Sequence, residues 1–493
     1  MRTLPTISPF EASTGSNRLA RPVAILALLL GAMFVGLLTI KMGVTAVGVV
    51  LGLGAALVYF YFVFNYPVVG LYTAVGLAFI LIGLGRYVRD LQVGLGMDAI
   101  LILTYLALFI NRFHKKVDLS PANKDITVLA VIWFGYSVFE IVNPEARSFA
   151  AWFSGRGISF YMFMMVPLTL LFINNYRKLD MFLYVWGAFS ILASLKGVMQ
   201  LQVGLDSAEQ AWLNDGNFKT HILFGRLRVF SFLSDAGQFG ANQAYSAVVA
   251  SIYAGSMTQR KSKIFFAIVA ALGFYGMMIS GTRGAISVPL VGLMTFFVLR
   301  KNIKVLAIGA GFLALVFVFF KFTMIGQGNP TIRRMRTAFD PNDASLQVRL
   351  DNQRLLKGYL ASRPFGGGIG HGGVKAQKYL PNAFLSQIAT DSWYVLIWVE
   401  QGIVGLLLHL FILFYTLIKA SLAIMFRVKD PRLRLKLGAL TAGMAGVMMA
   451  SYGNAVLGAM PTGMLMYISM AVILNSKQLE ANEQSSLNTP KAN

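Results

Sequence analysis

The sequence predicts an all-α, polytopic integral membrane protein, and its composition is the first reason. Of 493 residues, 56% are hydrophobic and only 13% are charged. The mean hydropathy of +0.65 lies far above that of soluble globular domains. Because a spanning helix needs roughly 20 apolar residues, the apolar runs predict about fourteen transmembrane helices, with about twelve as the lower bound.

These apolar runs follow one another along most of the chain. They are 22–40, 43–64, 67–85, 97–113, 126–143, 158–174, 179–202, 237–256, 264–280, 285–299, 303–323, 392–418, 436–456 and 459–474. The first is flanked by Arg18 and Arg21 and has no convincing cleavage site after it, so we interpret it as a retained span. A membrane domain is therefore expected over residues 22–474, between polar tails at 1–21 and 475–493.

Lysine and arginine collect in alternate short loops. After Arg18 and Arg21, the groups are Arg112, Lys115, Lys116 and Lys124; Arg177 and Lys178; Arg260, Lys261 and Lys263; Arg300, Lys301 and Lys304; and the run from Lys419 to Lys436. Basic residues resist translocation, so this side is predicted to be cytoplasmic, with both termini. The net charge of +23 then reflects orientation and not nucleic-acid binding. The low hydrophobicity of residues 1–17 and 477–493 predicts disorder in both tails.

One long connection, residues 324–390, is expected on the periplasmic face, and it is rich in basic residues. Its stretch SLQVRLDNQRLLKGYLASRP predicts an amphipathic helix from about 345 to 362, capped by Asp343 or Ser345. Such a helix would lie along the membrane interface, and attraction to anionic headgroups alone is the alternative to a functional role. Candidate contacts for anionic lipid or glycan in this connection are Arg349, Arg354, Arg363 and His371.

The stretch PFGGGIGHGG, residues 364–373, is rich enough in glycine to wrap a phosphate with backbone amides. It lacks the Gly-Lys-Ser/Thr ending of a nucleotide-binding loop. We therefore interpret it as a flexible connector.

Arginines occur beside apolar segments on the predicted outer face. Arg283 lies in the turn of MMISGTRGAISVPL, and Arg226 and Arg228 precede the span that begins near Gly237. A guanidinium is always charged and matches phosphate with a planar fork, so it suits a diphosphate headgroup. The alternative for Arg283 is that it reaches lipid phosphates only, and the sequence does not decide between Arg226 and Arg228.

Asp391 and Ser392, then nine residues, then Gly402-Ile403-Val404-Gly405, resemble a signature of the bacterial O-antigen ligase and polymerase family, in which a histidine commonly begins the motif. The turn SGTRGA, the preceding long loop and an arginine before the span at Gly237 also resemble that family, over residues 224–410. The resemblance implies a bacterial inner-membrane glycosyltransferase without metal or cofactor. It would move a glycan from undecaprenyl diphosphate to an acceptor hydroxyl at the periplasmic face, with Arg283 and Arg228 on the diphosphate.

The aspartate in place of histidine leaves two roles open for residue 391. Asp391 could accept the proton of the attacking hydroxyl, or it could cap the helix that follows. The departure favours a polymerase of surface polysaccharide or exopolysaccharide over an O-antigen ligase that uses lipid A core. The expected partners are the lipid-linked glycan, the glycan or lipid A core acceptor, membrane lipids and other polysaccharide assembly proteins.

Charged residues inside spans raise an alternative of another class. Glu140, Lys196 and Glu400 are predicted to form an internal ion-pair network, but in a water-filled path they would indicate a transporter or flippase of lipid-linked sugars. The chain shows no clear internal repeat, which favours the enzyme. A role in recruiting an export machine would use the tails, which carry no recognition motif. Cysteine is absent and histidine numbers four, without metal-ligand spacing, so no metal site is expected.

Overall fold

The computed structural model describes residues 26, 33, 40, 45–88, 93–115, 117–223, 225–340 and 342–488. The predicted tail 1–17, most of the predicted span 22–40, and also Arg18, Arg21 and Lys116, lie outside these residues. The chain divides into two compact units, residues 1–66 and residues 67–493. The first unit contains α2 (Thr45–Asn65).

The second unit consists of helices and one small hairpin. Its longer elements are α3 (Val68–Leu84), α4 (Val93–Lys115), α5 (Asp125–Phe139), α6 (Phe149–Gly155), α7 (Gly157–Phe172), α8 (Tyr176–Gln202), α11 (Ala236–Ala254), α12 (Arg260–Ile279), α13 (Ser287–Leu299), α14 (Ile303–Phe322), α16 (Ala344–Leu360), α18 (Trp393–Leu422), α19 (Pro431–Gly453), α20 (Thr462–Leu474) and α21 (Ser476–Asn488). Its shorter elements are α9 (Ser207–Trp212), α10 (Phe218–His221), β1 (Ile222–Leu223), β2 (Arg226–Leu227), α15 (Pro330–Arg336) and α17 (Phe384–Gln387).

The prediction of an all-α polytopic membrane protein is confirmed, and each apolar run after the first coincides with a helix. By length and composition, 8 helices of the described residues could cross a membrane, or up to 9 if α6 and α7, bent by 41°, form one span. Fewer spans are found than the predicted fourteen for three reasons. The run 22–40 lies largely outside the described residues, α11 is not among the candidate spans, and α3, the α13 segment and α20 form apolar helices of only 10–17 residues.

Helix α11 occupies the core of the second unit, where it packs against α8, α12, α13 and α19. All its residues from Ala236 to Ala250 are buried, and small residues such as Gly240 allow close approach of its neighbours. Polar side chains fix it to α20: Gln238 and Asn242 donate to Thr462 Oγ1 at 2.8 and 3.1 Å. These hydrogen bonds fix the N-terminal end of α11, and with it the position of the residues that precede the helix.

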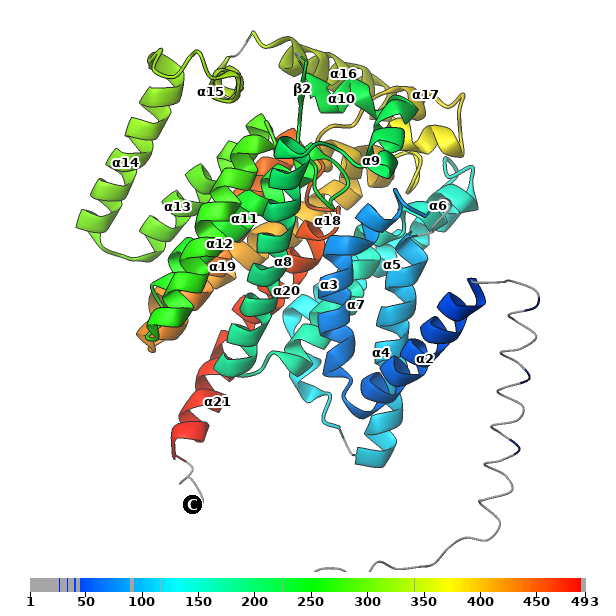
Figure 1. Cartoon of the computed structure of the whole chain (residues 1–493), viewed down its shortest axis with the longest axis vertical. Helices are drawn as coiled ribbons and strands as arrows, with labels where there is room; N and C mark the ends of the chain where they lie inside the picture. The colour runs from blue at the N-terminus through cyan, green and yellow to red at the C-terminus, as the bar shows by residue number, and fades with distance from the viewer. Residues whose placement is uncertain are drawn as a thin grey trace, which may run out of the picture. The chain divides into compact units, whose positions relative to one another are not determined.

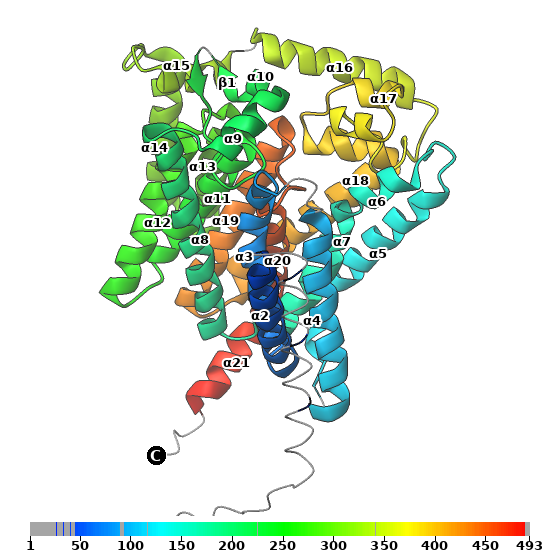
Figure 2. The same ribbon diagram turned by 45° about the vertical axis from the view of Figure 1, so that its right-hand side comes forward.

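The long segment and the hairpin lie at the same end of the second unit. In Figures 1 and 2, α15, α16 and α17 lie near α9, α10 and the hairpin, and α21 lies at the other end. Disorder was the wrong prediction for residues 477–488, because α21 is packed. Its Leu479 is fully buried, and Glu480 accepts hydrogen bonds from the backbone amides of Lys429 and Asp430, both at 2.8 Å.

Helix α16 confirms the predicted helix in the long segment. Its N-cap is Asp343, whose side chain accepts from Leu346 N at 3.1 Å. Leu356 and Leu360 are buried and belong to a small apolar cluster that also includes Val399 of α18. The helix is therefore tied to the bundle by packing.

Helix α18 is broken at Gly402, where φ is +65° and ψ is −168°, a conformation that requires glycine. The break frees backbone groups that water does not reach in a membrane. The amide of Val404 donates to Pro364 O at 3.3 Å, and Tyr136 OH donates to Gln401 O at 2.7 Å. The carbonyls of Val399 and Glu400 accept from Gly367 N and Gly368 N, at 2.8 and 3.0 Å.

The glycine-rich stretch 364–373 is therefore not a flexible connector, and that interpretation was wrong. Most of it is buried, and it fills the break in α18. Its glycines leave room for this contact, since a methyl group on Gly366 would lie 2.4 Å from Gly402 N and one on Gly370 would lie 2.0 Å from Ala151 O. The stretch is a docking element that fixes the long segment to α18.

We expect Gly402→Ala to destabilise the fold by about 3 kcal/mol or more, through backbone strain and steric overlap. A methyl group at this position would lie 2.0 Å from Pro364 O. Thermal unfolding of the purified protein in detergent measures the effect. The control is Gly358→Ala, at an exposed position of α16 where no atom lies within 4 Å of the added methyl group. This substitution should be neutral or slightly stabilising. Equal unfolding temperatures for the two variants would contradict the proposed constraint.

Candidate active site

The turn Ser280–Gly284 joins α12 to α13 and forms the base of the candidate site. Gly281 has a φ of +59°, which favours glycine. Thr282 Oγ1 donates to Ala236 O, at the start of α11, at 2.7 Å. Close packing leaves no room for a side chain at Gly284, where a methyl group would lie 2.2 Å from Asn454 Nδ2. The backbone that carries Arg283 is therefore fixed by α11 and by the residue that follows α19.

Arg228 reaches this turn from the hairpin. Its Nη1 donates to Thr220 O at 2.9 Å and its Nη2 donates to Thr282 Oγ1 at 3.1 Å. Its Nε is buried and makes no hydrogen bond within the described part of the chain. Burial lowers the pKa of Arg228, attraction to Asp235 raises it, and repulsion from Arg283 lowers it further. The guanidinium is thus held in place by neutral oxygen atoms.

Arg334 reaches the same turn from α15. Its Nε donates to Gly281 O at 2.5 Å. Burial, followed by repulsion from Arg228 and Arg283, lowers the pKa of Arg334 to about 10, although Asp343 opposes the shift. Since this pKa lies well above neutrality, Arg334 stays charged. We refer to Arg228, Arg283 and Arg334 as the arginine cluster.

Arg283 forms the ion pair of the arginine cluster. Its Nη1 donates to Asp343 Oδ2 at 2.5 Å and to Thr337 Oγ1 at 2.9 Å. The hydrogen bond from Arg283 is the main reason that the pKa of Asp343 is lowered. Within the described residues, this is the only ion pair that a member of the cluster makes. The cluster therefore keeps an excess of positive charge, which favours an anionic ligand.

Asp391 lies just before α18 and does not cap it, so the capping role was a wrong prediction. The N-cap is Ser392, which makes no side-chain cap hydrogen bond. Asp391 Oδ2 instead accepts from Arg349 Nε at 3.1 Å. The Asp391 side chain is half exposed, at 50%, so it is accessible from solvent.

The last residues of α19 connect the Asp391 pair to the arginine cluster. Arg349 Nη1 lies 4.0 Å from where a methyl group on Gly453 would be, and the next residue, Asn454, packs against Gly284. Ser392 Oγ also donates to Ser451 O at 3.3 Å. Both groups therefore border the same short segment, Ser451–Asn454, at one end of the bundle.

The other predicted contact residues have different surroundings. Arg226 is exposed on β2, and Arg354 is exposed in a pair with Asp351 at 2.8 Å. Arg363 pairs with Glu145 at 2.9 Å and stacks on Tyr359. His371 is buried, with Nε2 accepting from Ser148 N at 3.2 Å and Nδ1 lying 2.9 Å from Ile369 O. Burial lowers the pKa of His371, so the surroundings favour a packing role.

The predicted ion-pair network of Glu140, Lys196 and Glu400 is wrong, because each has other partners. Lys196 pairs with Asp206 at 3.3 Å and Glu209 at 3.0 Å. Glu140 accepts from Asn143 Nδ2 at 2.7 Å. Glu400 accepts from Gly372 N at 3.3 Å, in the docking element. Hydropathy marked these residues as embedded but carried no information on their partners.

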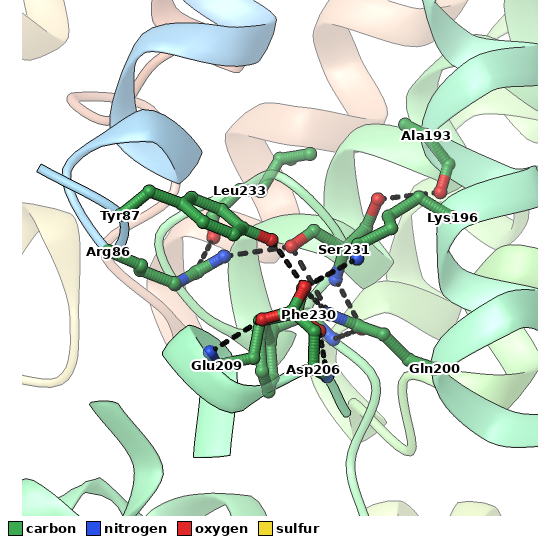
Figure 3. Close-up of polar contacts among 10 residues, drawn as sticks. All are labelled: Arg86, Tyr87, Ala193, Lys196, Gln200, Asp206, Glu209, Phe230, Ser231 and Leu233. Atoms are coloured by element: carbon green, nitrogen blue, oxygen red, sulfur yellow. Dashed lines mark hydrogen bonds and ion pairs between the residues drawn. The ribbon is translucent and has the colours of Figure 1, made fainter. Parts of the chain in front are cut away.

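The partners of Lys196 belong to a polar network that supports the segment between Arg228 and α11 (Figure 3). Arg86 donates to Ser231 O at 2.8 Å and to Leu233 O, and its guanidinium lies 4.5 Å from the ring centre of Phe230. Gln200 Oε1 accepts from Ser231 N at 2.8 Å. This network fixes the backbone just after Arg228.

Sequence reasoning did not single out Arg334 as a site residue, although it noted the excess of basic residues in the long segment. Nothing in the spacing of Arg333, Arg334 and Arg336 distinguishes the one that turns towards Gly281. No group of three or more metal-ligating side chains occurs among the described residues, and metal independence stays a prediction.

Comparison with known proteins concerns the middle of the chain. Residues 246–410 match the family model described as O-antigen ligase, and no curated protein matches the chain. The matched range contains Arg283, Arg334 and Asp391, while Arg228 precedes it. This match indicates a membrane glycosyltransferase-like role in polysaccharide assembly. The resemblance seen in the sequence is therefore confirmed over residues 246–410, which are similar to the O-antigen ligase family.

Proposed function

We propose that the protein is a metal-independent glycosyltransferase of the bacterial cytoplasmic membrane. It moves a glycan from an undecaprenyl diphosphate carrier onto an acceptor hydroxyl at the periplasmic face. The observation that carries this proposal is the arginine cluster, in which three guanidinium groups meet at one turn. Burial and then repulsion from the other two groups lower the pKa of Arg334, and a ligand that brings more than one negative charge relieves the repulsion.

The proposed reaction needs a leaving group and a proton acceptor. The acceptor hydroxyl attacks the anomeric carbon of the glycan, the bond from that carbon to the diphosphate oxygen breaks, and undecaprenyl diphosphate leaves with the electron pair. The fixed guanidinium groups of the arginine cluster stabilise the charge that develops on the diphosphate without reorganisation. Asp391 takes the proton of the hydroxyl, and Arg349 orients the carboxylate.

The proposed orientation agrees with the two ends of α14. Arg300, Lys301 and Lys304 lie where the helix begins, and the other end leads into the long segment with the arginine cluster. Basic residues in short loops favour the cytoplasm. We therefore place the cluster on the periplasmic face and, as the alternation of basic loops predicts, both termini in the cytoplasm.

We expect polymerisation of a surface polysaccharide or exopolysaccharide, because Asp391 stands where ligases commonly have histidine. Purified protein in nanodiscs is incubated with an undecaprenyl diphosphate-linked repeat unit, with and without lipid A core, and the lipids are analysed by gel and mass spectrometry. A ladder of multiples without core supports polymerisation. A product formed only with core would instead support an O-antigen ligase, and lipid movement across a vesicle without covalent change would support a transporter.

Arg283→Ala should lower glycan transfer by about 10²–10³-fold, the usual cost of removing a fixed donor to a developing negative charge. Product formation is measured at equal amounts of folded membrane protein. Arg300→Ala is the matched control and should keep the activity, because Arg300 follows the C-terminal end of α13 whereas Arg283 precedes its N-terminal end. Normal product from Arg283→Ala would remove this residue from the site.

Asp391→Asn should lower the turnover number by about 10²–10⁴-fold, because the amide does not accept the proton. Stability should change little, since Asp391 does not cap α18 and its exposed ion pair contributes about 1 kcal/mol or less. Asp391→His restores a base and should recover part of the activity. Unchanged turnover in Asp391→Asn would leave Asp391 only its pairing with Arg349.

A further inference from the structure

Both side chains that contact the Arg283 guanidinium come from one short stretch after α15. Thr337 and Asp343 accept hydrogen bonds from its Nη1. Arg228 and Arg334, in contrast, are held by a hydroxyl and by backbone carbonyls. Asp343 therefore brings the only carboxylate that pairs directly with the arginine cluster in the part of the chain that the structure describes.

The pair lies where a ligand from solvent can reach it. The side chains of Arg283 and Asp343 keep 22% and 20% of their surface exposed, while the Nε of Arg228 is buried. Asp343 divides its two oxygens between two tasks, since Oδ2 pairs with Arg283 and Oδ1 caps α16 through Leu346 N at 3.1 Å. The carboxylate can therefore leave Arg283 while its cap bond is kept.

We infer that Asp343 is an internal competitor that occupies the place of a donor phosphate on Arg283 and is displaced when the diphosphate binds. A carboxylate and a phosphate offer the same kind of charged acceptor to a guanidinium. The diphosphate brings more negative charge than one carboxylate and also neutralises Arg228 and Arg334. This inference rests on the proposed function and assigns to Asp343 a control of donor affinity.

The competition has a measurable consequence for the affinity. Donor binding must break the pair between Arg283 and Asp343, so the observed affinity is lower than that of a site whose arginine is unoccupied. The loss is modest because a partly exposed ion pair is weak. A role of Asp343 in positioning Arg283 for catalysis would have the opposite consequence, because loss of the pair would then lower the turnover number.

The test is Asp343→Asn, which removes the charge and keeps a side chain that caps equally well. Binding of undecaprenyl diphosphate to the purified full chain in detergent is measured by calorimetry at fixed salt. We expect the Kd to fall about three- to tenfold. In glycan transfer, the KM for the donor should fall with an unchanged kcat. Asp343→Glu keeps the charge and should keep the Kd of the wild type within about threefold.

Asp351→Asn is the matched control, because it removes the same charge from the same helix. Asp351 pairs with exposed Arg354 and does not contact the arginine cluster. The Kd of the Asp351→Asn variant for undecaprenyl diphosphate should therefore differ from that of the wild type by less than about twofold. An equal gain in affinity from both variants would reduce the effect to general electrostatics and overturn the inference. An unchanged or weaker affinity in Asp343→Asn would also overturn it.

The inference and the proposed function fail in different ways. Wild-type protein that binds undecaprenyl diphosphate without transferring glycan contradicts the proposed function, while the comparison of Kd values still decides on Asp343. Glycan transfer by the wild type, together with equal or weaker binding by Asp343→Asn, overturns the inference alone. Absence of binding in every variant overturns both.

Discussion

The break in α18 at Gly402 is the constraint on which the end of the second unit that carries the candidate site depends. A broken helix in a membrane must have its freed backbone groups satisfied by the protein, and the glycine-rich docking element supplies them. This contact fixes the chain between α16 and α17 against α18, and α16 adds its own packing on Val399. Asp391 and Arg349 meet because the segments that carry them are held to the same helix.

The arginine cluster depends on a second constraint, which is electrostatic. Burial of the guanidinium groups is the main cause of the lowered pKa values of Arg228 and Arg334, and repulsion among the three groups at one turn lowers them further. Backbone carbonyls and Thr282 hold Arg228 and Arg334 in place without neutralising them, whereas Arg283 pairs with Asp343. The fold therefore maintains positive charge at a fixed position, which is the arrangement that stabilises a developing anion without reorganisation.

Hydropathy predicted the positions of the helices because burial in lipid requires continuous apolar runs, and the cap and period of α16 predicted that helix from local chemistry alone. Partners far apart in sequence were beyond such reasoning. The docking of 364–373 on Gly402, the turn of Arg334 towards Gly281 and the pairing of Lys196 with Glu209 depend on tertiary packing. Helix α21 was missed because a single buried leucine, Leu479, gives little signal in a polar stretch.

The two halves of the candidate site are joined by α16. Asp343 at its N-cap contacts Arg283, and Arg349 further along contacts Asp391. At 1.5 Å per residue, these two positions lie about 9 Å apart along the helix axis. A diphosphate on Arg283 and a base at Asp391 would flank the sugar whose anomeric carbon reacts. Because one helix contacts both groups, the position of α16 fixes the distance between Arg283 and Asp391. In the proposed reaction, the donor site and the acceptor site would therefore share one structural element.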